Sequence, residues 1–147
     1  MAKVGNALTR SGSFLQKRTK KLLFVKTLAN MLAADTHPLI TPRVRKYLTT
    51  TGGFDDAAVR AWIIHWFTTG LTAVEQCLAT DPRTGAYCHG EQPSIADICL
   101  ASIIVITRVL KITIPDTPTI DRIMATCDAH PAFAKADPAR QTGAPAA

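Results

Sequence analysis

The sequence has no hydrophobic run long enough to cross a membrane. Its longest apolar stretch, from Ile98 to Thr107, is shorter than the ~20 residues that a transmembrane helix requires, and Asp97 and Arg108 bracket it. The composition is not that of a disordered chain either, because 47% of the residues are hydrophobic. The length of 147 residues is typical of one domain that can bury a core. We therefore predict a single globular domain with no membrane partner.

Acidic residues are absent from the first 34 positions, which contain seven basic residues. The rest of the chain contains ten basic and eleven acidic residues, so the net charge of +6 belongs to the N-terminal segment. Only Phe14 and Phe24 could stack on bases there, and we expect no nucleic-acid partner. We interpret residues 1–20 as a flexible, solvated basic leader. An organelle-targeting peptide, which is also basic and poor in acids, is the alternative.

Cysteines at metal-binding spacing are absent as well. The four cysteines form no Cys-x-x-Cys motif, and no paired Cys and His ligands occur at zinc spacing. We expect Cys77, Cys88, Cys99 and Cys127 to be reduced thiols, mostly packed as small apolar groups, in a cytoplasmic protein without a metal site.

Strands that alternate with helices, internal repeats and glycine-rich phosphate loops are also missing, and the sequence instead has helical periodicity, which predicts an all-α fold. An apolar stripe runs from Val59 to Leu78. Asp55 and Asp56 precede it, where carboxylates favour the positive end of the helix dipole. The stripe therefore predicts a long amphipathic helix.

An earlier helix is predicted over residues 22–33, and its continuation depends on proline. The residue before Pro38 is disfavoured in α geometry, so the helix either ends there or kinks and continues towards Leu48. Pro42 makes an unbroken helix less favourable.

The second half of the chain contains two helix starts. Ser94 and Asp97 have the spacing of a capping box, and the helix that follows is apolar on nearly every side, which predicts a central, fully buried helix. A last helix is predicted to begin at Thr117-Pro118 and to stop before His130-Pro131. We expect residues 86–93 to be short and extended, and residues 142–147 to be a disordered tail.

Several short motifs also occur in a particular order along the chain. They are His37-Pro38-Leu39, Arg43-Val44, Lys46-Tyr47-Leu48, Trp62, His65-Trp66, Gly70, Tyr87-Cys88-His89-Gly90, Pro93 to Leu100, Pro118-Thr119-Ile120, Pro131-Ala132-Phe133 and Pro138 to Gln141. In order and spacing they resemble the C-terminal helical domain of glutathione transferases, and within that family the zeta class, the maleylacetoacetate isomerases. The resemblance covers residues 21–141 and implies a helical bundle around a buried central helix.

The resemblance also implies a second domain. Family members begin with a thioredoxin-like domain that binds glutathione and activates its thiol, and residues 1–20 are too few for one βαβ unit of ~30 residues. Three interpretations stay open. The chain acts as an isomerase with a thioredoxin-like partner, it is a stand-alone helical module that homodimerises through its first two long helices or docks another protein, or it is a truncated family member with an unrelated basic leader.

Ligand positions of the family are partly changed in this sequence. Zeta relatives carry amide side chains where this chain has Ile40 and Thr41, which leaves Thr41 as a candidate substrate contact. On the central helix the family's Gln, Asn and Arg positions correspond to Ile103, Ile106 and Val109. Arg108 stands one residue from the family arginine, ~100° around the helix, and is the second candidate substrate contact.

The reaction that the resemblance implies is a glutathione-dependent cis–trans isomerisation in tyrosine and phenylalanine breakdown. A thiolate is the required nucleophile, and no residue of this sequence is an obvious activator of glutathione. Cys88 and His89 are adjacent, so in an extended segment their side chains point to opposite faces. We assign no catalytic residue and expect the chain alone to be inactive and not to bind glutathione. Ser94 and Asp97 are assigned to the capping box.

Overall fold

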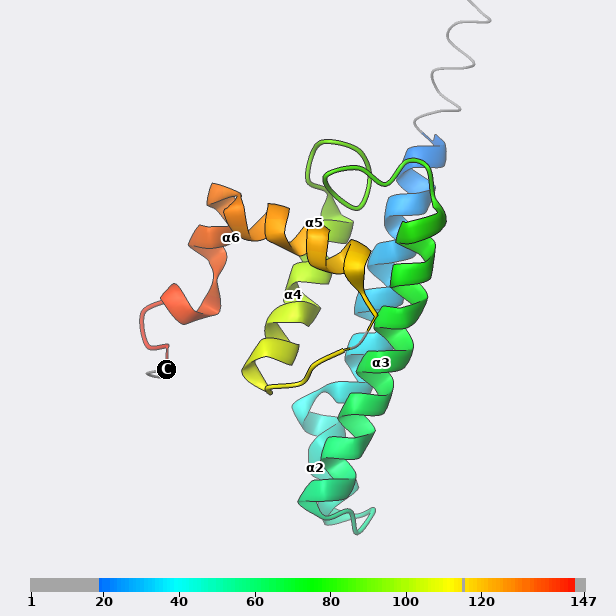
Figure 1. The fold of residues 1–147 in the computed structure, drawn as a ribbon. Coiled ribbons are helices and arrows are strands. Elements are labelled where there is room, and N and C mark those ends of the chain that lie inside the picture. The colour runs from blue at the N-terminus through cyan, green and yellow to red at the C-terminus, as the bar shows by residue number, and fades with distance from the viewer. Residues whose placement is uncertain (1–18, 115, 145–147) are drawn as a thin grey trace, which may run out of the picture.

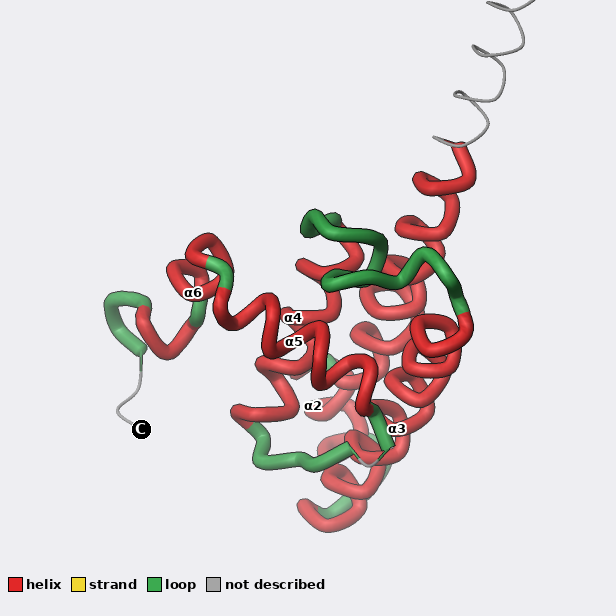
Figure 2. The backbone as a smooth tube through the Cα atoms, turned by 45° about the horizontal axis from the view of Figure 1, so that its top comes forward, coloured by secondary structure: helices red, strands yellow, loops and turns green. Residues whose placement is uncertain are grey.

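The computed structural model describes residues 19–114 and 116–144, and this part of the chain is helical without a strand (Figures 1 and 2). The predicted all-α class is therefore confirmed. Residues 19 and 20 of the predicted leader are helical, and its other residues, like 145–147 of the predicted tail, lie outside the described residues. The elements are a helix over 19–30, η1 (Met31–Thr36), η2 (His37–Ile40), α2 (Pro42–Thr50), α3 (Asp56–Thr80), α4 (Ile95–Val109), α5 (Pro118–Ala129), α6 (Pro131–Ala136) and η3 (Pro138–Arg140).

The first helix passes through Pro38 by changing its hydrogen-bond pattern. Residues 31–36 form a π-helix and residues 37–40 a 3₁₀ turn. His37 keeps α geometry (φ −59°, ψ −40°), which favours the second of the two alternatives, in which the helix continues past Pro38. The chain leaves helical geometry at Thr41 (ψ 155°), because the residue before Pro42 favours an extended backbone.

The long helix α3 begins and packs as its sequence predicts. The Asp55 side chain caps it by accepting from the Ala58 N–H at 2.8 Å. Its apolar stripe is buried, including Phe67, Leu71 and Val74, and lies against the helical segment that ends in η1 (Figure 1). Gly70 lies at this contact, where an added Cβ would be 2.7 Å from Thr36 Cγ2. A residue without a side chain is therefore needed there for the two helices to approach.

Helix α4 contacts both η1 and α5, and it buries Leu100 and Ile103 in the core. The fold is thus a helical bundle around this element, but the expectation that α4 is buried on every side was wrong. Ile95, Ile98 and Val109 are 52%, 56% and 71% exposed. Apolar periodicity alone does not distinguish a face covered by the same chain from a face left open.

The loop before α4 is compact, whereas the sequence predicted an extended segment. Tyr87 N–H donates to Gly90 O at 3.0 Å, and Gly90 N–H donates to Arg83 O at 2.8 Å. Gly90 has a φ of 72°, which glycine adopts without strain. These bonds fold residues 83–90 back on themselves.

Helix α5 starts at the predicted Thr117-Pro118, but its capping group comes from another helix. The Thr117 side chain makes no cap hydrogen bond. Instead, the buried Glu75 carboxylate of α3 accepts from the N–H groups of Thr119 (2.9 Å) and Ile120 (2.8 Å). No helix in the described part of the chain is long and apolar enough to span a membrane.

Candidate functional site

The N-terminus of α4 is organised around one buried carboxylate. Asp97 is fully buried, and its oxygens accept from the Cys88 N–H, the Ser94 N–H and the Ser94 hydroxyl, each at 2.7 Å. The capping box between Ser94 and Asp97 is present. A buried carboxylate needs such donors because desolvation would otherwise make its charge costly. Asp97 thereby joins α4 to the preceding loop.

The buried thiols beside Asp97 are poor nucleophiles. Cys88 is 1% exposed, and burial followed by the nearby Asp97 carboxylate raises its pKa far above the ordinary value. Burial likewise raises the pKa of Cys127 to about 11. A thiolate is the reactive form of cysteine, so neither group is ionised near neutral pH. His89 does not pair with Cys88, because both of its ring nitrogens are buried and lack a hydrogen-bond partner among the described residues.

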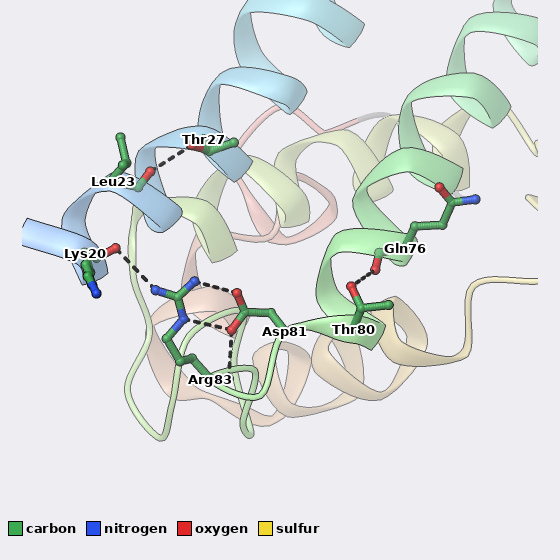
Figure 3. Close-up of polar contacts among 7 residues, drawn as sticks. All are labelled: Lys20, Leu23, Thr27, Gln76, Thr80, Asp81 and Arg83. Carbon is green, nitrogen blue, oxygen red and sulfur yellow. Dashed lines mark hydrogen bonds and ion pairs between the residues drawn. The ribbon is translucent and has the colours of Figure 1, made fainter. Parts of the chain in front are cut away.

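The loop is tied to the first helix by an arginine that sequence reasoning missed. Figure 3 shows the Arg83 guanidinium facing the Asp81 carboxylate, with contacts of 2.8 and 2.5 Å, and reaching the Lys20 carbonyl at 3.5 Å. It also lies over the Phe24 ring, 4.6 Å from the centroid. The ion pair lowers the pKa of Asp81 to about 2, chiefly through the hydrogen bonds from Arg83.

The two candidate substrate contacts are both engaged within the chain. Thr41 is half-buried, precedes α2, and donates its hydroxyl proton to Pro38 O at 3.2 Å. Arg108 is exposed on α4 and pairs with Asp128 of α5 at 2.7 Å. Their roles as substrate contacts stay predictions.

The four positions at which the family resemblance predicts polar side chains divide into two groups. Ile40 and Ile103 belong to the hydrophobic core and are almost fully buried. Ile106 is half-buried and Val109 is exposed. Ile40 and Ile103 therefore stabilise the bundle rather than line an open surface.

Helix α4 leaves an apolar stripe exposed. Ile95, Ile98 and Val109 share a face with Ser102 and the half-buried Val105, at alternating spacings of three and four residues. Helices with this spacing pack against a partner through that face. Within residues 19–114 and 116–144, no cluster of His, Cys, Asp or Glu could hold a metal ion.

Comparison with known proteins shows the family to which this helical domain belongs. The chain is 36% identical over 117 residues to the maleylpyruvate isomerase of a Ralstonia species, and 35% identical over 120 residues to the maleylacetoacetate isomerase of Pseudomonas aeruginosa. These matches cover 80% and 82% of this chain. The chain carries a helical domain of the zeta-class glutathione transferases. No family model matches it.

The zeta-class assignment is supported by three-dimensional similarity. The maleylacetoacetate isomerase of Methylobacterium extorquens AM1, whose crystal structure contains malonate and glutathione, superposes with a TM-score of 0.84 at 38% identity. The alignment covers 87% of this chain and 60% of that one. The chain spans about half the length of the curated relatives, 55% of the Ralstonia protein and 54% of the Pseudomonas protein.

Proposed function

We propose that this zeta-class domain is the helical half of a glutathione-dependent isomerase, which converts the cis double bond of a maleyl diketo acid to trans. The exposed stripe of α4 carries the proposal, because it suits docking of a thioredoxin-like, glutathione-binding domain. Ile95, Ile98 and Val109 together present an apolar face, and such faces are typical of interaction surfaces. The relatives' names support the reaction class.

The proposed chemistry explains why the docked domain is needed. Glutathione thiolate adds to one alkene carbon, the resulting single bond rotates, and the same thiolate leaves as the trans double bond forms, so no atom is gained or lost. The step begins with a stabilised thiolate. The described residues contain no group suited to that task, so the docked domain supplies it and the helical domain is inactive alone.

Arg108 contributes to this proposal as a carboxylate-binding group. Its pair with Asp128 is exposed on both sides, and such pairs contribute only about 0–1 kcal/mol. If a substrate carboxylate takes the place of Asp128 as the partner of Arg108, little free energy is lost. Guanidinium groups bind carboxylates in a bidentate way. Thr41 would contribute its hydroxyl oxygen as an acceptor.

Calorimetric titration with reduced glutathione tests the separate domain. We expect no saturable heat from the 147-residue chain. Saturable binding or glutathione-dependent isomerisation by this chain alone would contradict the assignment of the thiol-activating step to a second domain.

A fusion tests the docking surface. The thioredoxin-like domain of the Ralstonia relative, joined to this chain, is expected to bind glutathione and to isomerise maleylpyruvate. Ile98→Glu on the α4 stripe should abolish the isomerisation, whereas Ile64→Glu, an isoleucine of α3 that is 36% exposed, should not. Equal activity of the Ile98→Glu fusion would exclude docking through α4. A different pair of results would favour the stand-alone dimerisation module. In that case the fusion has no activity, and the chain alone self-associates unless it carries Ile64→Glu.

A further inference from the structure

The first helix exposes two large apolar side chains near its N-terminal end. Leu22 and Leu23 are 54% and 66% exposed, whereas Val25 and Leu28 of the same helix are buried in the core. Both leucines precede the exposed Lys26 by three or four residues, so the three side chains share the outer side of the helix. This end of the helix stands at the edge of the bundle (Figure 1), and the Leu23 side chain points away from α3 (Figure 3).

The charge around these leucines has one sign. Lys20, Lys21 and Lys26 are exposed, and residues 19–30 contain no acidic residue. None of the three lysines forms an ion pair with another described residue. The sequence before this helix adds four basic residues and again no acid. The net positive charge of the chain is therefore concentrated around Leu22 and Leu23.

An open hollow of about 350 Å³ adjoins the same part of the helix. Its lining combines apolar and basic side chains with one hydroxyl group, and consists of Lys20, Leu23, Phe24, Thr27 and Arg83. Asp81 lies next to this lining, but its carboxylate is paired with Arg83. The negative charge of Asp81 is thus already compensated, and the lysines keep the surface positive.

Exposed leucines among unpaired lysines suit the surface of a membrane that contains anionic lipids. A helix that lies at such a surface buries apolar side chains at the boundary of the acyl chains, while its lysines extend to the charged headgroups. Each basic group near an anionic leaflet strengthens binding about fivefold. Nucleic acid would match the charge but not the leucines, because bases stack on aromatic rings and aliphatic side chains would gain nothing.

We propose that the first helix docks this domain on anionic lipid headgroups at a membrane surface, through Lys20, Lys21 and Lys26 and the two leucines between them. The contact is peripheral, so it needs no hydrophobic run long enough to cross a bilayer. The prediction of no membrane partner is thereby restricted to membrane-spanning segments. This surface lies on a different helix from the α4 stripe and Arg108, so the proposal does not rest on the isomerase function.

Sedimentation with lipid vesicles tests the surface in the full chain. We expect binding to phosphatidylcholine vesicles that contain about 30% phosphatidylserine, and no binding to vesicles of phosphatidylcholine alone. Raising the salt concentration from about 0.1 M to about 0.5 M should weaken the binding, because salt screens the charges. Equal binding to the two kinds of vesicle, or binding to neither, would overturn the proposal.

Two charge-matched variants locate the contact. The triple variant Lys20→Gln, Lys21→Gln and Lys26→Gln should bind the anionic vesicles about 100-fold more weakly. In the control, which should lose about fivefold or less, the same change is made at three exposed lysines elsewhere in the chain. These are Lys46, Lys111 and Lys135. Because the two variants have the same net charge, equal losses would show that binding follows overall charge, and would contradict docking through the first helix.

Changes at the leucines distinguish a membrane from a nucleic-acid partner. Leu22→Gln combined with Leu23→Gln leaves the charge unchanged and should weaken vesicle binding about tenfold. Ile95→Gln combined with Ile98→Gln, at two similarly exposed positions of α4, should not weaken it. Unchanged vesicle binding by the leucine variant, or preference of the wild type for single-stranded RNA over the anionic vesicles, would overturn the proposal. The wild-type comparison of the two kinds of vesicle remains decisive even if a variant does not fold.

Discussion

At the scale of single residues, Asp97 has the widest structural role in this domain. Its carboxylate accepts two N–H groups and a hydroxyl, and these donors come from two segments, the loop at Cys88 and the helix start at Ser94. The Cys88 bond is buried and the two Ser94 bonds are part-buried, so the Cys88 N–H depends most on the carboxylate for its hydrogen bond. Asp97 consequently determines both where α4 begins and how the loop is attached to it.

Removal of the Asp97 carboxylate should be strongly destabilising. We expect Asp97→Ala to lower the free energy of unfolding by about 3–5 kcal/mol, because one buried and two part-buried donors lose their acceptor at once. Urea denaturation measures this value. Asp128→Asn is the matched control, since it removes an exposed carboxylate and should cost about 1 kcal/mol or less. Similar losses for the two variants would contradict the role given to Asp97.

At the scale of elements, the first helix and the loop after α3 are held together by polar groups far apart in sequence. Arg83 connects the Asp81 carboxylate to the Lys20 carbonyl and covers the Phe24 ring (Figure 3). Arg122 of α5 reaches the same loop by donating to Gly85 O at 2.7 Å. The compact loop is thus positioned by contacts with the first helix and with α5, which lie far from it in the sequence.

The Asp81–Arg83 pair should make stability depend on pH in the acid range. The pKa of Asp81 is about 2 in the folded protein and 3.8 ordinarily, so folding favours the ionised form. Its stabilisation is present above pH 3.8 and is lost as the pH falls through about 2. We expect a contribution of about 1 kcal/mol, because the Arg83 side chain is 41% exposed and solvent screens the pair.

Denaturation of wild type and Asp81→Asn at several pH values measures this contribution. The difference in unfolding free energy between the two proteins should shrink steadily from pH 5 to pH 2. A difference that stays constant over that interval would show that the carboxylate gains nothing from Arg83.

At the scale of the whole molecule, contacts between α3 and α5 join the middle of the chain to its C-terminal part. Glu75 accepts from two N–H groups at the α5 N-terminus, 44 and 45 residues away. Its negative charge also favours the positive end of the α5 dipole. The same bundle leaves the α4 stripe uncovered, and the proposed docking of a second domain would complete its burial.

Weakening the Glu75 cap should lower the stability of the whole domain and not of α5 alone. We expect Glu75→Gln to lower the unfolding free energy by about 1–3 kcal/mol, because one oxygen must serve two donors and an amide group faces them. A single transition with an unchanged denaturant slope is expected, since α5 has no core of its own. Asp121→Asn, an exposed change in the first turn of α5, should have an effect below about 0.5 kcal/mol. A separate early transition in Glu75→Gln would show that α5 unfolds independently.

The amino-acid sequence by itself determined the features that depend on neighbouring residues. The all-α class, the helix starts at Asp55, Ser94 and Thr117, and the apolar stripe of α3 follow from capping side chains and helical spacing, which act within a few residues. The family motifs were likewise readable from the sequence. The positions of Thr41 and Arg108 could be named, but their present partners, Pro38 O and Asp128, could not.

Only the tertiary structure decided features whose causes lie far apart in the chain. The passage of the first helix through Pro38 depends on packing of η1 against α3, and the compact loop depends on Arg83 and Asp97. Ile103 is buried and Ile98 is exposed because of the elements that surround α4. In an isolated helix both side chains would be equally exposed. Capping by Glu75 has the same origin. Local periodicity specifies that a face is apolar, and three-dimensional packing alone specifies what covers it.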